Sequence, residues 1–465
     1  MVKAVAAVDL GATSGRVMLG YVGHNELRLV PVSRFPNGPV ETPDGLHWNI
    51  TGLYEHALAG LTTAAAQEPE LVSVGVDSWA VDYALLNAGR ALGEPFHYRD
   101  ARTATGVAAV HERVAASELY ASTGLQHLPF NTVFQLAEDA QAGRLAAADS
   151  FLLVPDLLGF WLTGTAVAER SNASTTGLFN ATTGEWDDDL IRRVGLPRSI
   201  FPTLIDAGAR LGGLRPELAA RVGTPNLQVT TVGSHDTASA IVAIPAADTD
   251  FAYISCGTWS LVGVELEKPI LSEASRAANF TNEGGVDGRV RYLRNVMGLW
   301  LLSETVRLWN GDLTQLLEQA AAYDGPVAIF DPDDERFLPP GDMPARIAAW
   351  CEENGIAAPG SRPALVRSIL ESLAAAYART IDTARALSGA TVNTVHLVGG
   401  GSQNALLCQL TADATGIPVV AGPVEATAIG NVLVQARAAG IVSGDLETLR
   451  ALVARSVPRT VYLPR

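Results

Sequence analysis

The chain contains one strand–turn–strand pattern twice, and this repeat limits its fold more than any other feature. AAVDLGATSGRVMLG (residues 6–20) and AYISCGTWSLVGVE (residues 252–265) each contain an apolar run, a turn of glycine and hydroxyl residues, and a second apolar run. The repeat predicts two similar α/β domains facing one cleft, with a β-hairpin repeated by chance as the structural alternative. The expected seam is IPAADTD, residues 244–250, which gives domains at 1–243 and 250–465.

Apolar runs alternate with helical stretches along the chain, which predicts an α/β architecture with largely parallel strand pairing. The clearest helix is predicted over 363–388, with Pro363 in its first turn and Gly389 just beyond its end. The pattern then predicts further elements in this order: strand 394–398, helix 404–415, strand 417–421 and helix 425–439.

Charge and composition exclude several classes of protein. The formal net charge of −16 over 465 residues argues against binding of a nucleic-acid backbone, which needs a basic surface. Three cysteines, odd in number and far apart, define neither a disulfide framework nor a zinc site. The apolar residues before Asp9 are too few for a signal-peptide core, and no run of about 18 apolar residues indicates a membrane span. We therefore expect a cytoplasmic protein with neither a nucleic acid nor a membrane as partner.

Lysine is almost absent: of the 33 basic residues, only Lys3 and Lys268 are lysines. A Walker A loop needs a lysine after its glycines, and a protein kinase needs one on its third strand. Neither lysine has such a neighbourhood, and no G-x-G-x-x-G opens a helix. A phosphate-binding site in this chain must therefore use backbone N–H groups, hydroxyls, arginine and a divalent ion.

The turn after Asp9 fits that requirement. Glycine lets backbone N–H groups approach phosphate oxygens, and neighbouring hydroxyls add donors. Asp9 would then hold Mg²⁺ through its waters, and Arg16 would reach the phosphates. The structural alternative is a tight turn in which the aspartate caps local N–H groups.

VGSHDTASA, residues 232–240, predicts a catalytic base. Its Asp236 lies where a strand ends and a helix-prone run begins, a position suited to accept a proton from an attacking hydroxyl. The alternative is a plain helix cap, and His235 beside it is equally consistent with a hydrogen-bonded core histidine.

Two more segments are candidates for ligand contact. GVDSWAVDYALL (residues 75–86) combines two aspartates with Trp79, a pattern of sugar sites, although solvated acids on an edge strand would look the same. Downstream, YRDARTATG is equally consistent with surface ion pairs. VHLVGGGSQNALL (residues 395–407) offers side-chain-free backbone for a nucleoside, or simply a flexible turn.

Taken together, DLGATSGR, SHDTASA, SCGTWS and VGGGSQN resemble the FGGY family of carbohydrate kinases. The resemblance runs from residue 5 to about 435 through the phrases VDSWAVDY, LPFNTVFQL, VPDLLGFWLTG, SNASTTGLFN, NFTNEGG, NVMGLWLL and GPVEATAIGN. It implies two ribonuclease H-like or actin-like domains around an interdomain cleft, with ATP and Mg²⁺ as cofactors. These phrases are most similar to family members that phosphorylate the 1-hydroxyl of L-rhamnulose in L-rhamnose catabolism.

The resemblance also implies roles for single residues. Asp236 would accept the proton, and Asp9 would hold the metal. The ATP contacts would be Ala12, Thr13, Ser14, Gly15, Arg16, Thr258, Ser303, Gly400 and Gly401. The ketose site would be formed by Ala80, Asp82, His235, Asp236, Thr237 and Asn295.

The chain departs from the family pattern at three of these places. Ala80 stands where glycine is frequent, which narrows the sugar pocket. Ser303 stands where a glutamine often contacts the nucleotide, and Cys256 replaces a usual serine of similar size.

Three functions remain open from the sequence. The first is phosphorylation of L-rhamnulose, and the second is phosphorylation of another ketose or polyol, such as L-fuculose or a xylulose. The third is an ATP-binding actin-like regulator without sugar chemistry.

Overall fold

The structure, a computed structural model, describes residues 2–465 and consists of two compact units. The first contains residues up to Ala247 together with Leu266–Tyr292 and Ala426–Val457, and the second contains the remaining segments, Asp248–Glu265, Leu293–Glu425 and Pro458–Arg465. The chain first passes from one unit to the other inside the expected seam. The units are nevertheless not the two contiguous halves of the prediction, because two later segments belong to the first unit.

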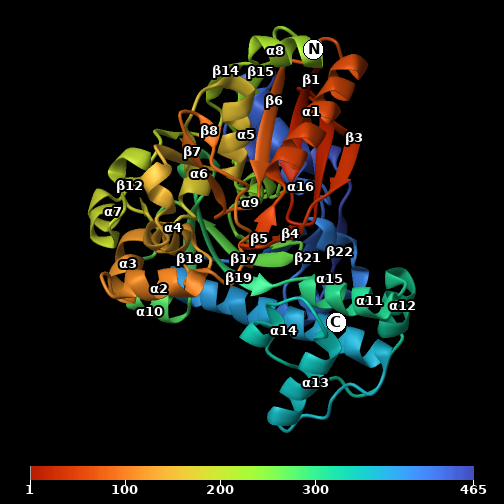
Figure 1. The fold of residues 1–465 in the computed structure, drawn as a ribbon. Coiled ribbons are helices and arrows are strands. Elements are labelled where there is room, and N and C mark those ends of the chain that lie inside the picture. Colours follow the sequence, from red (N-terminus) through yellow and green to blue (C-terminus); the bar gives the residue numbers. More distant parts are fainter. Residues whose placement is uncertain (1) are drawn as a thin grey trace. The chain divides into compact units, whose positions relative to one another are not determined.

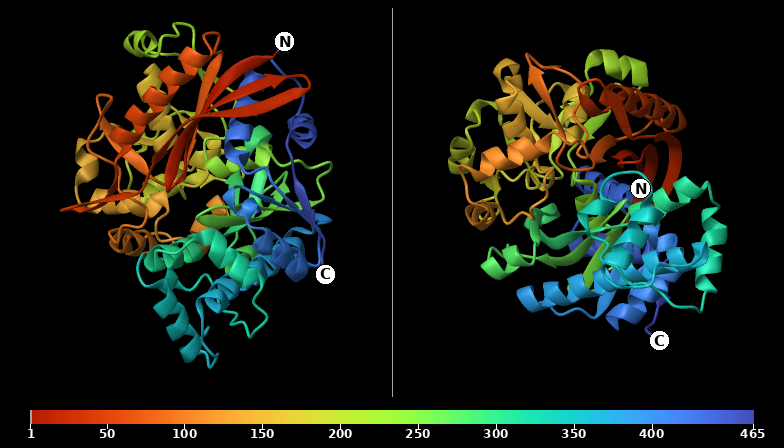
Figure 2. Two further views of the ribbon diagram at one scale, coloured as in Figure 1. Left: turned by 90° about the vertical axis from the view of Figure 1, so that its right-hand side faces the viewer. Right: turned by 60° about the horizontal axis from the view of Figure 1, so that its bottom comes forward.

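The first unit is built on a mixed sheet in the order β14-β15-β6-β1-β2-β3. Its strands are β1 (Lys3–Leu10), β2 (Ser14–Gly23), β3 (Glu26–Pro36), β6 (Ser73–Ser78), β14 (Arg210–Gly213) and β15 (Gln228–Thr230). Strand β6 runs parallel to β1 and β15, whereas the pairs β1–β2, β2–β3 and β14–β15 are antiparallel. The prediction of largely parallel pairing was therefore wrong. Short turns join β1 to β2 and β2 to β3 as hairpins, and β14 pairs antiparallel with β15 after a connection that contains a helix, Pro216–Val222. Figure 2 shows β1, β2 and β3 side by side in red.

Two helices cover opposite faces of this sheet, α1 (Ile50–Gln67) and α16 (Ala426–Ala438) (Figure 1). A Cβ on Gly60 of α1 would touch Val17, and a Cβ on Gly20 would touch Val432 of α16. Residues 17 and 20 of β2 point to opposite faces of the sheet, so α1 covers the face of Val17 and α16 covers the face of Gly20. Covered on both faces, β1 is buried from Ala4 to Leu10, which accounts for its unbroken apolar run.

A second apolar cluster of the first unit is formed by the long connection between β6 and β15. The connection also contains α5 (Val154–Thr163), whose buried side chains pack with the main sheet instead. The second cluster includes the antiparallel strands β7 (Tyr83–Asn87) and β9 (Ser150–Leu153) and the helices α2 (Thr103–His111), α3 (Ala116–Thr123), α4 (Thr132–Gln141) and α7 (Asp188–Val194). Tyr83, Phe134, Phe151 and Trp186 lie in its core. The connection ends at β15, and the short helix α9 (Asp236–Val242) follows that strand.

The second unit has strands in the order β17-β16-β20-β21-β22. They are β16 (Phe251–Cys256), β17 (Trp259–Leu266), β20 (Thr394–Val398), β21 (Val419–Ala421) and β22 (Thr460–Tyr462). Strand β16 is antiparallel to β17 and parallel to β20, β20 is parallel to β21, and β21 is antiparallel to β22. The series β2-β1-β6-β15-β14 of the first unit has the same directions in the same order. The predicted internal repeat is confirmed as a repeat of topology.

Helices of the second unit include α11 (Trp300–Trp309), α12 (Leu313–Ala321), α13 (Met343–Glu353), α14 (Arg362–Ser388) and α15 (Ala405–Thr415). Helix α14 agrees with the predicted range and ends at Gly389, whose φ of 72° is left-handed. The elements predicted after it are present with boundaries shifted by at most two residues. In the described part of the chain the three cysteines are free and buried.

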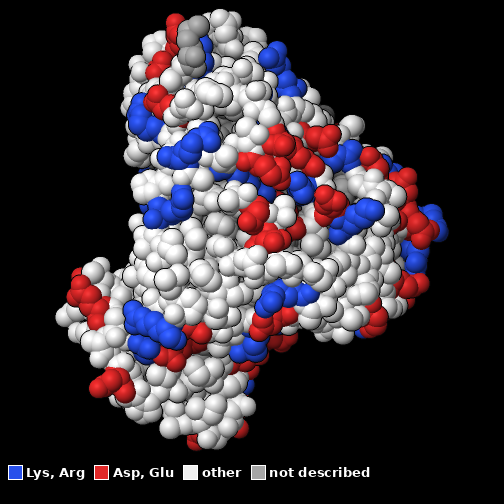
Figure 3. Space-filling view, turned by 180° about the vertical axis from the view of Figure 1, so that it is seen from behind, with Lys and Arg blue, Asp and Glu red and all other residues white. Residues whose placement is uncertain are grey.

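On the face that Figure 3 draws, acidic and basic side chains are interspersed. Among residues 2–465, no helix combines the length and the apolar character that crossing a membrane requires.

Candidate active site

Asp9 and Asp77 are the second-last residues of two neighbouring parallel strands, β1 and β6, and lie at paired positions. Both side chains are buried, and Arg16, opposite Asp9 on β2, donates from Nε to Asp9 Oδ2 at 2.9 Å. The carboxyl ends of parallel strands are the usual place for ligands in an open α/β sheet. The aspartate that interrupts the first apolar run thus belongs to a group of charged side chains at this edge.

Helix α16 supplies the polar contact beneath Asp77. Asn431 Nδ2 donates to Asp77 Oδ2 at 2.5 Å, and Gln435 Nε2 donates to the Ala6 carbonyl at 2.9 Å. Asp77 Oδ1 has no hydrogen-bond partner among residues 2–465. Burial and the neighbouring Asp9 raise the pKa of Asp77 well above its usual range. Two adjacent carboxyls with an unpaired oxygen create a local demand for a proton or a cation.

The turn between β1 and β2 is closed by main-chain contacts. Gly11 N–H donates to the Ser14 carbonyl at 3.0 Å, and the Asn37 side chain donates to the Gly11 carbonyl at 2.8 Å. A Cβ on Gly15 would lie 2.2 Å from the Phe35 ring, so packing alone requires glycine there. Thr13 is exposed at the tip. The predicted phosphate contacts of Ala12, Thr13, Ser14, Gly15 and Arg16 stay a prediction.

Asp82 is a buried hydrogen-bond acceptor with four donors. Its Oδ2 accepts from Trp48 Nε1, Trp79 Nε1 and the Tyr98 N–H at 2.6, 3.1 and 3.1 Å, and its Oδ1 accepts from Gln135 at 2.9 Å. Burial raises its pKa to about 6, against the lowering effect of these donors. Protein donors therefore use much of its capacity, and its predicted contact with a sugar stays a prediction.

The loop around Ala80 has a strained backbone. Asp82 N–H donates to the Ala80 carbonyl at 2.9 Å across Val81, whose φ is 68°. A left-handed β-branched residue is rare and costs free energy, and such outliers cluster at functional sites. Thr132 holds the turn by donating to the Val81 carbonyl at 2.7 Å. The turn keeps Ala80 half-buried.

Trp79 is less available than the sequence analysis assumed. Its side chain is buried, its ring lies 4.0 Å from that of Trp48, and its N–H is used by Asp82. Ala80, which is half-buried, is thus better placed than Trp79 to give a sugar an apolar contact. Similarly, Arg102 is no surface residue, because it forms a largely buried pair with Asp139 at 2.7 Å.

His235, Asp236 and Thr237 form the start of helix α9, beside the end of β6. A β-bridge joins His235 to Ser78, and Ser78 N–H donates to the Ser234 carbonyl at 2.9 Å. The Asp236 side chain keeps 29% of its surface exposed, whereas His235 is buried. Asp236 also acts electrostatically on Asp77. The first unit therefore brings Asp9, Asp77 and Asp236 to one edge of its sheet.

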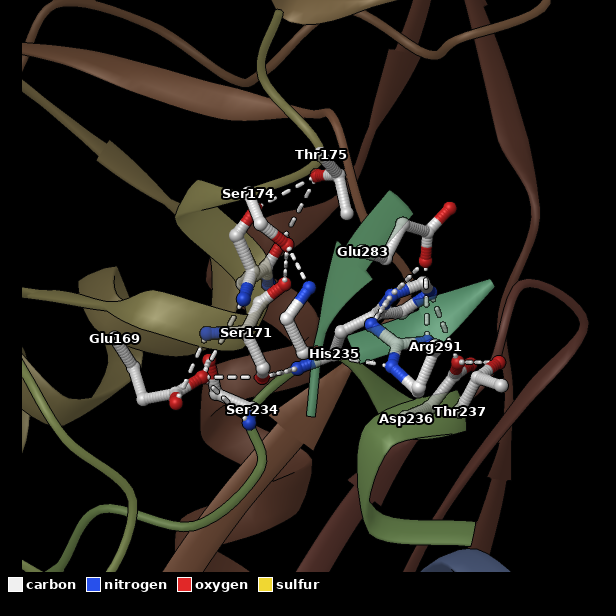
Figure 4. A network of polar contacts seen from close by, with 12 residues as sticks. Glu169, Ser171, Ser174, Thr175, Ser234, His235, Asp236, Thr237, Glu283 and Arg291 are labelled. Atoms are coloured by element: carbon white, nitrogen blue, oxygen red, sulfur yellow. Dashed lines mark hydrogen bonds and ion pairs between the residues drawn. The ribbon is translucent and has the colours of Figure 1, made fainter. Parts of the chain in front are cut away.

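A buried carboxylate, Glu169, fixes the approach to α9. It accepts from the backbone and hydroxyl of Ser234, both at 3.0 Å, and from the N–H of Ser171 at 3.0 Å (Figure 4). Sequence reasoning did not single out Glu169, nor Glu283, Arg291 and Asn431. The last three lie in or near quoted family phrases, yet no spacing rule links them to Asp236, because they come from distant segments.

The remaining predicted residues lie in the second unit. Thr258 occupies the β16–β17 turn, where its carbonyl accepts from Trp300 N–H at 3.2 Å. After β20, Gly401 packs against Cys256, since an added Cβ would lie 2.2 Å from Sγ, while Gly400 has no neighbour within 4 Å. Asn295 lies half-buried on β19 (Val290–Met297), and Ser303 is exposed on α11. Their ligand contacts stay predictions.

No group of three or more His, Cys, Asp or Glu side chains in the described chain has an arrangement that could hold a metal ion unaided. The pair Asp9 and Asp77 still suits Mg²⁺, because this ion is usually held by one or two carboxylates together with waters and substrate phosphates.

Comparison with known proteins identifies the family. The N-terminal domain model of the FGGY family of carbohydrate kinases matches residues 4–243, and its C-terminal domain model matches residues 252–439. The chain belongs to the FGGY family of carbohydrate kinases and is an enzyme of that class. The non-catalytic regulator that the sequence left open is therefore excluded.

Curated relatives match over nearly their whole length. The chain is 42% identical to a rhamnulokinase of Bacteroides thetaiotaomicron, covering 99% of this chain and 95% of the relative. It is 41% identical to a rhamnulokinase of Pectobacterium carotovorum, covering 100% and 94%, and 39% identical to one of Enterococcus faecalis, covering 98% and 93%.

Solved structures share the fold at low identity. A ligand-bound xylulose kinase from Lactobacillus acidophilus has a TM-score of 0.81 at 15% identity, covering 100% of this chain and 94% of its own. A Plasmodium falciparum glycerol kinase with ADP has a TM-score of 0.78 at 15% identity, with the same coverage. The predicted two-domain kinase fold is confirmed.

Proposed function

We propose that this protein transfers the γ-phosphoryl group of ATP to the 1-hydroxyl of L-rhamnulose, giving L-rhamnulose 1-phosphate and ADP. The observation that carries the proposal is the identity of 39–42% with curated rhamnulokinases along nearly the whole chain. A fold alone would not choose the sugar, because one fold serves many substrates.

Asp236 is the proposed proton acceptor. Its carboxylate is the partly exposed member of the three grouped in the first unit, so it can meet a substrate hydroxyl. The hydroxyl oxygen forms a bond to the γ-phosphorus, the bond from that phosphorus to the β–γ bridging oxygen breaks, and the hydroxyl proton passes to Asp236. Positioning and charge supply most of the rate enhancement in such transfers.

Asp9 is the proposed metal residue, with Asp77 beside it. When bound, Mg²⁺ would neutralise charge on the ATP phosphates, a task that lysine performs in P-loop proteins. The unpaired buried oxygen of Asp77 supports a cation at this edge. We assign the ATP phosphates to the turn from Ala12 to Arg16 and to Thr258, and the adenosine to Gly400 and Gly401.

Beside Asp236, the residues proposed to face the ketose are Ala80, Asp82, His235, Thr237 and Asn295. A hydroxyl of the wrong configuration would leave a buried polar group unpaired, which is a strong basis for discrimination. The methyl end of the 6-deoxyketose would lie against Ala80.

A substrate panel tests the proposal. Initial rates with Mg²⁺ and ATP are measured for L-rhamnulose, L-fuculose, D-xylulose, L-ribulose and glycerol, and the phosphorylated position is read by ³¹P–¹H NMR. We expect the highest kcat/KM for L-rhamnulose, with phosphate on the 1-hydroxyl and L-fuculose weaker. A clear preference for a xylulose, ribulose or glycerol would contradict the sugar assignment and leave the kinase chemistry intact.

A further inference from the structure

His235 lies in front of two buried charged side chains from neighbouring strands. Glu283 belongs to β18 (Thr281–Gly284) and Arg291 to β19. The exposed fractions of His235, Glu283 and Arg291 are 6%, 4% and 0%. Figure 4 shows the three side chains clustered next to Asp236.

The two ring nitrogens of His235 face different partners. Nδ1 lies 3.1 Å from Arg291 Nη2 and 3.2 Å from Glu283 Oε2, and Nε2 lies 3.5 Å from Asp236 Oδ1. The contact with Arg291 is a hydrogen bond. The contact with Glu283 is not, because Oε2 makes no hydrogen bond within the described chain.

A guanidinium has only donors, so the nitrogen that it meets must offer a lone pair. Arg291 therefore requires Nδ1 to be unprotonated. A neutral imidazole without a proton on Nδ1 carries it on Nε2, the atom that faces Asp236.

Glu283 compensates the charge of Arg291 at 3.1 Å. Burial alone would raise the pKa of Glu283, but the positive charge of Arg291 holds it below its usual value. Arg291 is further fixed by donating from Nε to the Gly284 carbonyl at 2.9 Å, so its plane cannot turn away from the ring.

We propose that Arg291 and Glu283 are positioning residues that hold His235 in the Nε2–H form. His235 is thereby a fixed hydrogen-bond donor at the place where Asp236 meets the sugar hydroxyl. Before substrate binds, its proton faces the Asp236 carboxylate across 3.5 Å, a contact that tightens or passes to a sugar oxygen in the complex. This inference rests on the proposed role of Asp236 in sugar phosphorylation, but not on which sugar is used.

NMR of ¹⁵N-histidine-labelled protein tests the tautomer directly. The chain has eight histidines, and the signals missing in His235→Gln assign His235. In the long-range ¹⁵N–¹H spectrum at neutral pH we expect Nδ1 unprotonated and Nε2 protonated. A proton on Nδ1, alone or in an imidazolium, would overturn the proposal whatever sugar the enzyme prefers.

A pair of substitutions tests the function of that proton. The amide nitrogen of Gln can occupy the place of Nε2, whereas the amide of Asn reaches only to that of Nδ1. We expect His235→Gln to exceed His235→Asn in kcat/KM for the sugar by roughly tenfold or more, with equal KM for ATP. Equal rates, or a better Asn variant, would refute the role of the Nε2 proton.

Arg291→Lys and Arg291→Met complete the test, with circular dichroism melting to check folding. Both substitutions should lower kcat/KM for the sugar more than kcat/KM for ATP. Arg291→Lys should lose less than Arg291→Met but remain below the wild type, because lysine cannot form the planar contact of a guanidinium. The substrate in these assays is the sugar with the highest kcat/KM in the panel. A wrong assignment of L-rhamnulose as substrate can therefore be told apart from a wrong assignment of Arg291. An Arg291→Met enzyme with unchanged kcat/KM for the sugar would contradict the proposal, and if this variant fails to fold, the NMR result still decides.

Discussion

Asp77 and Asp82 occupy one short stretch of sequence but have opposite surroundings. Asp82 accepts four hydrogen bonds from donors of the protein. Asp77 has one oxygen held by Asn431 and the other unpaired. The residue types alone could not separate these roles, because the donors to each carboxyl come from segments remote in the chain.

Asp236→Asn should lower kcat by about 10²–10⁴-fold, since the variant cannot accept the hydroxyl proton. The affinity for ATP should change little, because Asp236 is assigned to the sugar. Steady-state kinetics and ATP titration by calorimetry measure the two quantities. Turnover at the wild-type rate would remove Asp236 from its proposed role.

Asp82 should make stability depend on pH. Its pKa of about 6 in the folded protein is above the value of about 3.9 in unfolded chains, so the folded state binds more protons between these values. Stability is therefore lost as pH rises through this window. Compared with Asp82→Asn, the wild type should lose about 1 kcal/mol of unfolding free energy between about pH 5 and about pH 7.5.

Equilibrium urea unfolding followed by tryptophan fluorescence measures this difference. Glu55→Gln is a matched control, because Glu55 is an exposed carboxylate whose pKa is lowered by Arg221. If the free energy of unfolding changes with pH in the same way for the wild type and Asp82→Asn, Asp82 ionises normally.

Hairpin turns and helix contacts explain glycines that look functional in the sequence. Gly15 makes room for Phe35, and Gly401 makes room for Cys256. Gly430 of α16 is the closest of these approaches, since a Cβ there would lie 1.8 Å from the Ser239 carbonyl oxygen of α9. The helix that begins at Asp236 is thus located by a backbone contact with α16.

Gly430→Ala should destabilise the protein by roughly 1–3 kcal/mol although alanine favours a helix, because the methyl group must push the two backbones apart. It should also lower kcat by displacing Asp236. Gly159→Ala in α5 is the control, since its nearest atom is the end of the flexible Leu211 side chain at 3.0 Å. Calorimetric melting and steady-state kinetics compare the two variants. Equal melting temperatures would contradict the proposed backbone contact between α16 and α9.

Much of the element order could be predicted from the sequence, but the pairing directions could not. Helix 363–388 and the elements after it carry strong local signals: apolar periodicity, a proline at the start and a glycine at the end. The antiparallel hairpins and the position of α16 depend on long-range packing, which local patterns do not encode. For the same reason, the sequence could not show that Arg291 and Glu283 contact His235.

Across the whole molecule, the two units repeat one topology while the chain passes between them more than once. Helix α16 belongs to the first unit but lies near the carboxyl end of the chain, so a fragment that contains only the amino-terminal half lacks this helix. Without Asn431 and Gln435, the polar contacts beneath β1 and β6 are lost.

A fragment of residues 1–247 should accordingly fail to fold as a cooperative unit. Burying Asp77 without its partner, and exposing the sheet face that α16 covers, both cost free energy. Circular dichroism should show no sharp thermal transition for the fragment, in contrast to the full chain. A melt as cooperative as that of the full chain would show that residues 426–457 are dispensable.

The position of α16 near the carboxyl end of the chain also affects how the enzyme folds during synthesis. A ribosome synthesises the strands of the first unit several hundred residues before the helix that covers them. During that interval we expect one apolar face of the sheet to be open, and chaperones or temporary contacts with later segments of the chain would have to cover it. Its two units cannot mature one after the other, and a premature stop in the last forty residues would damage the unit that was synthesised first.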